Sequence, residues 1–127
     1  MIKNKIGTYY KRSSKKSTLI VFIHGAACDH TIWSFQNRFF YNKGFSTLSI
    51  DLPGHGNNRY KTNNTIKNFS NLLLDLVKNL SHKEVLLVGH SMGSLICLNA
   101  LLHNFDIIKK AFLIGISYPM LVNKLLL

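Results

Sequence analysis

Acidic residues are scarce in this chain of 127 residues: five Asp and Glu stand against 16 Lys and Arg, which leaves a formal net charge of +11. A charge of this size raises the question of nucleic acid as a partner. The lysines are scattered, however, apart from a short basic run at residues 11–16. We therefore expect a solvated basic face and no nucleic-acid site.

Cysteines and long apolar runs are also few. Cys28 and Cys97 are the only cysteines, which argues against a disulfide framework, and no cluster has metal-ligand spacing. Both are expected to be small buried hydrophobes. No apolar run reaches the length of about 18 residues that a membrane-spanning helix needs. Residues 1–16 are basic and polar and lack the apolar stretch of a secretory signal, so a cytoplasmic location is expected.

Buried strands and amphipathic helices alternate along the chain. Within the first helix, Ile32, Phe35, Phe39 and Phe40 share one face, and Gly44 is its expected stop. Single helices between strands require right-handed crossovers and a parallel sheet. The expected fold class is therefore α/β, a three-layer sandwich with a mostly parallel, doubly wound sheet. Strands are expected at 5–11, 18–24, 45–51, 84–88 and 110–116, and helices at 31–43, 65–80 and 92–102.

Residues 89–93 have the sequence GHSMG, which matches the G-x-S-x-G pattern of a nucleophilic serine. The pattern alone is weak, but it directly follows an expected strand and directly precedes an expected helix, as the chemistry requires. A strained turn there would present the Ser91 hydroxyl above the edge of the sheet. The glycines let the strand and helix approach closely, and the helix N-terminus favours negative charge at the site.

Two other loops follow expected strands at the same edge of the sheet. Residues 24–28 (HGAAC) can supply a backbone N–H that forms an oxyanion hole together with the N–H of Met92. The alternative for this loop is an ordinary glycine-containing turn. Residues 51–56 (DLPGHG) form the second loop. There Asp51 is expected to brace the turn by hydrogen bonds rather than to take part in catalysis.

The three motifs HGAACDHTIW, DLPGHG and GHSMG, in this order, resemble those of the α/β-hydrolase superfamily, and most of all its capped esterase, lipase and C–C hydrolase branch. The resemblance covers residues 18–117. It implies Ser91 as the nucleophile, Ala26 and Met92 as oxyanion N–H donors, a small ester-like substrate, and neither metal nor organic cofactor. It also implies that residues 1–117 are the N-terminal part of the hydrolase core, truncated before the last strands, and that residues 118–127 begin a cap segment.

The rest of the catalytic triad departs from the family pattern, in which an acid and then a histidine follow the serine. After Ser91 the chain offers only Asp106 and His103. His103 lies 12 residues along a helix, about 18 Å away, and Asp106 lies at the wrong edge of the sheet. His30 and His55 stand in loops at the catalytic edge, but all six histidines are expected to have surface, turn or packing roles.

These observations predict a serine hydrolase by descent that is weak or inactive as this chain. Two other classes stay open: a non-catalytic interaction module that keeps the fold, and a nucleic-acid binder that uses the net charge of +11. The strand at 110–116 would form an open apolar edge of the sheet. Self-association through that edge is expected.

Overall fold

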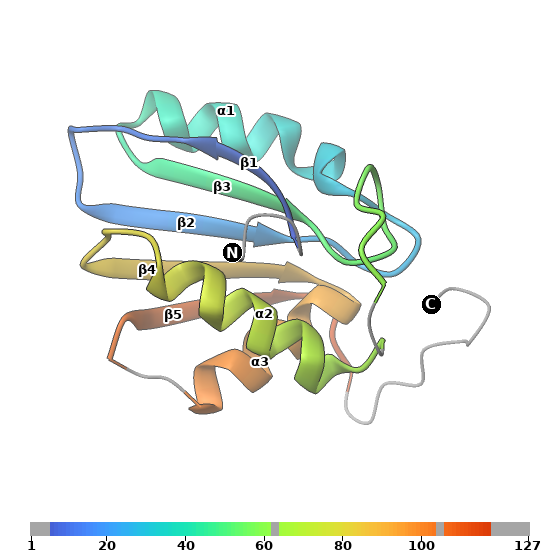
Figure 1. The fold of residues 1–127 in the computed structure, drawn as a ribbon. Helices are drawn as coiled ribbons and strands as arrows, with labels where there is room; N and C mark the ends of the chain where they lie inside the picture. The colour runs from blue at the N-terminus through green and yellow to red at the C-terminus, as the bar shows by residue number, and fades with distance from the viewer. Residues whose placement is uncertain (1–5, 62–63, 104–105, 118–127) are drawn as a thin grey trace.

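The computed structural model describes residues 6–61, 64–103 and 106–117. Five strands form one sheet in the order β1-β3-β2-β4-β5, in which β1 runs antiparallel to β3 and all other neighbours are parallel (Figure 1). The strands are β1 (Gly7–Lys11), β2 (Thr18–Ile23), β3 (Ser46–Asp51), β4 (Glu84–His90) and β5 (Ile108–Ile114). The helices are a 3-10 turn (His30–Trp33), α1 (Ser34–Asn42), α2 (Ile66–Lys78) and α3 (Met92–His103).

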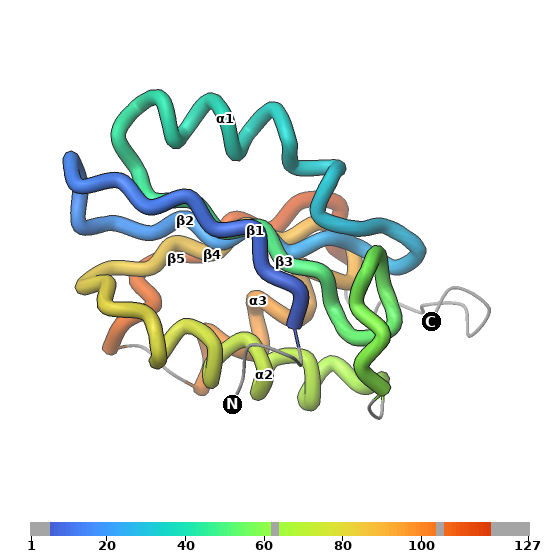
Figure 2. The backbone as a smooth tube through the Cα atoms, turned by 45° about the horizontal axis from the view of Figure 1, so that its top comes forward, coloured from blue at the N-terminus to red at the C-terminus, as the bar shows by residue number. Residues whose placement is uncertain are grey.

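The elements form three layers, as expected. Helix α1 lies alone on one face of the sheet, and α2 and α3 lie on the other (Figure 2). Side chains of a strand point alternately to the two faces. In β2, Leu19, Val21 and Ile23 therefore join the main core under α2 and α3, while Ile20 and Phe22 join a smaller cluster with Trp33 on the α1 side. A strand buried on both faces explains the unbroken apolar run at residues 18–23.

The ends of the elements follow local chemistry. The Thr65 hydroxyl caps α2 by accepting the N–H of Asn68 at 3.2 Å. Gly44, at φ +91°, turns the chain after α1 as expected. Strand β5 begins at Ile108 and ends at Ile114, two residues earlier than expected. Gly115, at φ +63°, turns the chain out of the strand there, and Ile108 is buried against the core.

The orientation of α1 differs from the sequence expectation. Ile32, Phe35 and Phe39 do share a side, but that side points to solvent, and only Phe40 of the expected apolar face is partly buried. The inner side instead carries Asn37, whose amide N–H donates to Ser49 Oγ and whose carbonyl accepts from the Thr47 hydroxyl, both at 2.7 Å. These two bonds to β3 satisfy a buried polar side chain and hold the helix in this rotation.

The two cysteines are free and lie in different environments. Cys97 is buried in the main core, and this burial raises the pKa of its thiol, which fits the expected small hydrophobe. Cys28 is only partly buried, in the loop after β2.

No helix in the described part of the chain is both long enough and apolar enough to span a membrane. The cytoplasmic location stays a prediction.

Candidate active site

Ser91 stands alone between β4 and α3, in the strand–turn–helix setting that the sequence predicts. Its φ of +54° lies in the left-handed region, which a residue other than glycine adopts at a cost of about 1–3 kcal/mol. The Ser91 N–H donates to the carbonyl of Ile114 at 2.8 Å, and its carbonyl accepts the N–H of Ser94 at 2.9 Å. The strained turn is thus held from the end of β5 and from the first turn of α3.

Gly89 and Gly93 flank this turn because no side chain fits there. A Cβ atom on Gly89 would lie 2.4 Å from the carbonyl oxygen of Gly93. One on Gly93 would lie 2.4 Å from the carbonyl oxygen of Ile23. Both neighbours are backbone atoms, so the glycines let α3 begin directly against β4 and β2.

The loop after β2 lies against the serine. A Cβ atom on Gly25 would meet both the Ser91 Cβ and the His90 Nδ1 at 3.1 Å. Ala26 is partly exposed in this loop, and Met92 is fully buried at the start of α3. Neither Ala26 nor Met92 uses its amide N–H in the turn, loop and cap hydrogen bonds of the described residues.

His24 joins this loop to the neighbouring one. The buried ring accepts the N–H of Leu52 at Nε2 (3.1 Å), so its Nδ1–H donates to the carbonyl of Gly25 (2.7 Å). This pair of bonds requires a neutral ring. Burial lowers the pKa of His24 below its ordinary value of 6.5. His24 is therefore a structural clamp between the loops after β2 and β3.

A pH dependence of stability follows from this clamp. Because the folded-state pKa of His24 is depressed, the unfolded chain binds more protons as the pH falls below about 6.5, and the free energy of unfolding should fall with it. One proton contributes at most about 1.4 kcal/mol per pH unit. Urea unfolding at a series of pH values between 5 and 8 measures the slope. The slope of the free energy of unfolding against pH should flatten in His24→Gln and persist in the control His103→Gln, because the replaced His103 ring is exposed. An unchanged slope in His24→Gln would show that another group titrates.

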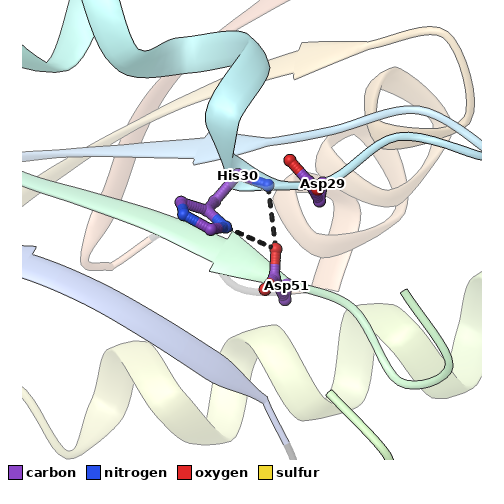
Figure 3. Close-up of side chains that lie close together, drawn as sticks. All are labelled: Asp29, His30 and Asp51. Atoms are coloured by element: carbon purple, nitrogen blue, oxygen red, sulfur yellow. Dashed lines mark hydrogen bonds and ion pairs between the residues drawn. The ribbon is translucent and has the colours of Figure 1, made fainter. Parts of the chain in front are cut away.

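Asp51 ties three segments together at the end of β3. Its carboxylate accepts the backbone N–H of His30 at 2.8 Å and the His30 Nδ1–H at 2.9 Å (Figure 3). It also accepts the N–H of Asn57 at 3.2 Å and the hydroxyl of Tyr9 at 3.3 Å. Tyr9 stacks on the His30 ring, with the ring centroids 3.3 Å apart. The expectation that Asp51 braces its turn agrees with these contacts.

The side chains of Asp29, His30 and Asp51 offer donor atoms within 4.8 Å of one another. Each is already engaged: Asp29 accepts the N–H of Thr31 at 2.8 Å, and Asp51 accepts from His30. The cluster is thus satisfied by the protein's own donors and serves as a brace. Sequence reasoning missed the His30–Asp51 pair, although both residues follow neighbouring strands at the same edge of the sheet.

No histidine bonds to Ser91 in the described part of the chain. The Nδ1 atoms of His30 and His55 are used by Asp51 and by the carbonyl of Pro53, respectively. His103 is exposed at the far end of α3, and its Nδ1–H donates to Asn99 within the same helix. His90 is adjacent to Ser91, and its buried Nδ1 has no hydrogen-bond partner. The structure thus assembles the serine turn and the neighbouring loop without a histidine bonded to Ser91.

A doubly wound sheet with a serine at positive φ between a central strand and its following helix defines the α/β-hydrolase class of folds. The family model described as alpha/beta hydrolase fold matches residues 18–127, and the chain belongs to this family.

Several relatives carry esterase, lipase or hydrolase names. A putative esterase/lipase 2 of Mycoplasma pneumoniae is 32% identical over 84 residues, which cover 65% of this chain and 31% of that protein. The (E)-2-((N-methylformamido)methylene)succinate hydrolase of Acinetobacter baylyi is 29% identical over 108 residues, which cover 84% of this chain and 40% of that enzyme. The chain thus spans well under half the length of these relatives.

Solved structures show the same fold. An epoxide hydrolase from Vigna radiata superimposes with a TM-score of 0.80 at 20% identity, covering 94% of this chain and 37% of the other. An esterase from Exiguobacterium antarcticum superimposes with a TM-score of 0.78 at 23% identity, covering 85% of this chain and 40% of the other.

Proposed function

We propose that the chain carries the nucleophile and oxyanion half of a serine hydrolase that acts on small ester-like carbonyl compounds. The observation that carries this proposal is the positive φ of Ser91, held against the loop after β2. Strain of this kind persists only where the surrounding structure enforces it, and it is common at catalytic sites. The esterase, lipase and hydrolase names of the relatives support the same class of reaction.

In the proposed reaction the Ser91 Oγ forms a bond to the carbonyl carbon while a base takes its proton. The N–H groups of Ala26 and Met92 hold the resulting oxyanion. The alcohol leaves with a proton, and water then releases the acid from the acyl-enzyme. No histidine bonds to Ser91 among the described residues, so we expect weak activity from this chain alone. Loss of one triad member typically lowers kcat by several orders of magnitude.

Two Ser91 variants test the proposal, assayed on p-nitrophenyl acetate. Both Ser91→Ala and Ser91→Gly should lose the residual turnover, whereas Ser81→Ala, an exposed serine before β4, should keep it. Ser91→Gly should in addition raise the free energy of unfolding by about 1 kcal/mol over Ser91→Ala, because glycine relieves the positive φ. Turnover that survives in both variants would remove Ser91 from the mechanism.

The second candidate is a binding module, and the observation that favours it is the edge of the sheet. In the described part of the chain, β5 is the last strand of the sheet and no other strand pairs with its outer side. Phe112 and Ile114 of this strand are 56% and 48% exposed. They border an apolar groove of about 340 Å³ whose floor includes Phe22, Trp33 and Val88. An uncovered apolar edge favours pairing between chains.

We therefore expect concentration-dependent oligomers of the isolated chain in light scattering. The variant Phe112→Lys, on the solvent side of β5, should shift the chain towards monomer, while Leu102→Lys on α3, which is 59% exposed, should not. A wild-type chain that is monomeric at all concentrations would contradict self-association.

A further inference from the structure

The outward side of α1 carries apolar side chains where a helix that covers a sheet normally presents polar ones. Phe35 is 76% exposed, Phe39 55% and Ile32 40%. Asn37 occupies the inner side and is 7% exposed. Phe35 and Phe39 are thus directed away from the core, although the Phe39 ring still packs edge-to-face on the Phe40 ring, with the centroids 5.2 Å apart.

Basic side chains accompany these rings. The Arg38 guanidinium lies 5.9 Å from the centroid of the Phe35 ring, and the Lys43 ammonium lies 5.6 Å from that of Phe39. Residues 30–50 contain no Asp or Glu. We use the name α1 ridge for five residues of α1 and its two ends: Ile32, Phe35, Arg38, Phe39 and Lys43.

The basic run at residues 11–16 continues this surface. The Lys11 ammonium lies 5.6 Å from the centroid of the Tyr41 ring in α1. The Lys15 side chain lies beside Gly44, directly after α1, and the Lys16 ammonium lies 3.9 Å from the Phe45 ring centroid. The basic run at residues 11–16, although distant from α1 in sequence, therefore lies against the end of this helix in the folded chain.

We propose that the α1 ridge docks the protein on an anionic phospholipid surface. Phenyl rings on one side of a helix bury into the boundary between headgroups and acyl chains, while neighbouring Lys and Arg stems reach the anionic headgroups. Because α1 forms an outer layer by itself (Figure 2), a flat surface can meet the whole ridge. The net charge of +11 complements such a surface.

A lipid surface fits the ridge better than a nucleic acid does. Bases stack on aromatic rings, but Ile32, which is exposed in the 3-10 turn that precedes α1, offers no stacking surface. The docking is independent of the proposed hydrolase activity, since none of the ridge residues belongs to the Ser91 turn or to the loop after β2.

Vesicle flotation in a density gradient tests the docking with the intact chain, because protein aggregates sink while vesicles rise. The chain should float with vesicles of phosphatidylcholine and phosphatidylglycerol in equal parts and stay below with phosphatidylcholine alone. Raising the salt to about 1 M should strongly reduce flotation, because the Debye length then shrinks to about 3 Å.

Two pairs of variants separate the parts of the ridge. Phe35→Ser/Phe39→Ser should lower the apparent affinity for the mixed vesicles by about tenfold or more, while Leu102→Ser, an exposed leucine on α3, should leave it unchanged. Arg38→Glu/Lys43→Glu should lower it by a similar factor. Its matched control is Lys67→Glu/Lys78→Glu, which makes the same change of charge on exposed positions of α2, across the sheet.

Three results would overturn the proposal. The first is no flotation of the wild-type chain with the mixed vesicles. The second is equal losses in the α1 variants and their controls, which would indicate a response to total charge or apolarity alone. The third is a single-stranded oligonucleotide or a second copy that binds with the same dependence on Phe35 and Phe39 while vesicles do not. Circular dichroism of each variant shows that the fold is retained, as expected for side chains this exposed.

Discussion

Gly93→Ala is expected to lower the free energy of unfolding by about 3 kcal/mol or more, enough to unfold a marginally stable chain. In an ordinary helix, replacing glycine by alanine stabilises by about 1 kcal/mol, so the predicted sign is the reverse of the helix-propensity rule. The reason is contact with backbone. A Cβ atom at Gly93 would lie 2.4 Å from the carbonyl oxygen of Ile23 and 2.6 Å from that of His24, and β2 cannot move away without breaking its pairing with β3 and β4.

Urea unfolding followed by circular dichroism measures this cost against a matched glycine. Gly54 has φ +78° and no atom within 4 Å of its would-be Cβ. Gly54→Ala should therefore cost only the backbone strain, about 1 kcal/mol. If Gly93→Ala proved as stable as the wild type, α3 would have to start farther from β2 than the structure shows.

Much of the fold could be predicted from local pattern. The apolar run of β2 predicts burial on both faces, and both faces are indeed covered. The G-x-S-x-G pattern between a strand and a helix predicts the turn at Ser91, because the pattern itself lies within five consecutive residues. The parallel order of the strands then brings the loop after β2 beside that turn. These inferences succeed because each depends on neighbours in sequence or on one strand pairing.

The rotation of α1 could not be predicted in the same way. Helical periodicity tells which residues share a side of a helix, but it does not tell which side meets the sheet. Here the Asn37 side chain hydrogen-bonds to the hydroxyl groups of Ser49 and Thr47 on β3. Because Asn37 lies on the inner side of the helix, Phe35 and Phe39 lie on the outer side. The pairing of Asp51 with His30 was missed for a related reason, since it depends on how two loops from neighbouring strands meet.

Asp51→Ala is expected to cost about 3–5 kcal/mol in the free energy of unfolding. Among the described residues the buried carboxylate accepts hydrogen bonds from four donors, on His30 (N–H and Nδ1–H), Asn57 and Tyr9. The variant leaves all four donors without this acceptor. Asp51→Asn keeps the volume and one acceptor oxygen but turns an amide N–H₂ towards donors. The free energy of unfolding of Asp51→Asn should therefore lie between those of the wild type and Asp51→Ala.

The control is Asp75→Ala, which removes an exposed carboxylate from α2 and should stay within about 0.5 kcal/mol of the wild type. A double-mutant cycle with His30→Ala then isolates one pair. Because His30 supplies two of the four donors to Asp51 but its variant keeps the backbone N–H, His30→Ala should cost less than Asp51→Ala. The two changes should also be strongly non-additive, with a coupling energy of about 1 kcal/mol or more. Additive costs would mean that the ring of His30 contributes nothing through Asp51, and that the brace rests on the backbone N–H groups of His30 and Asn57 and on the Tyr9 hydroxyl.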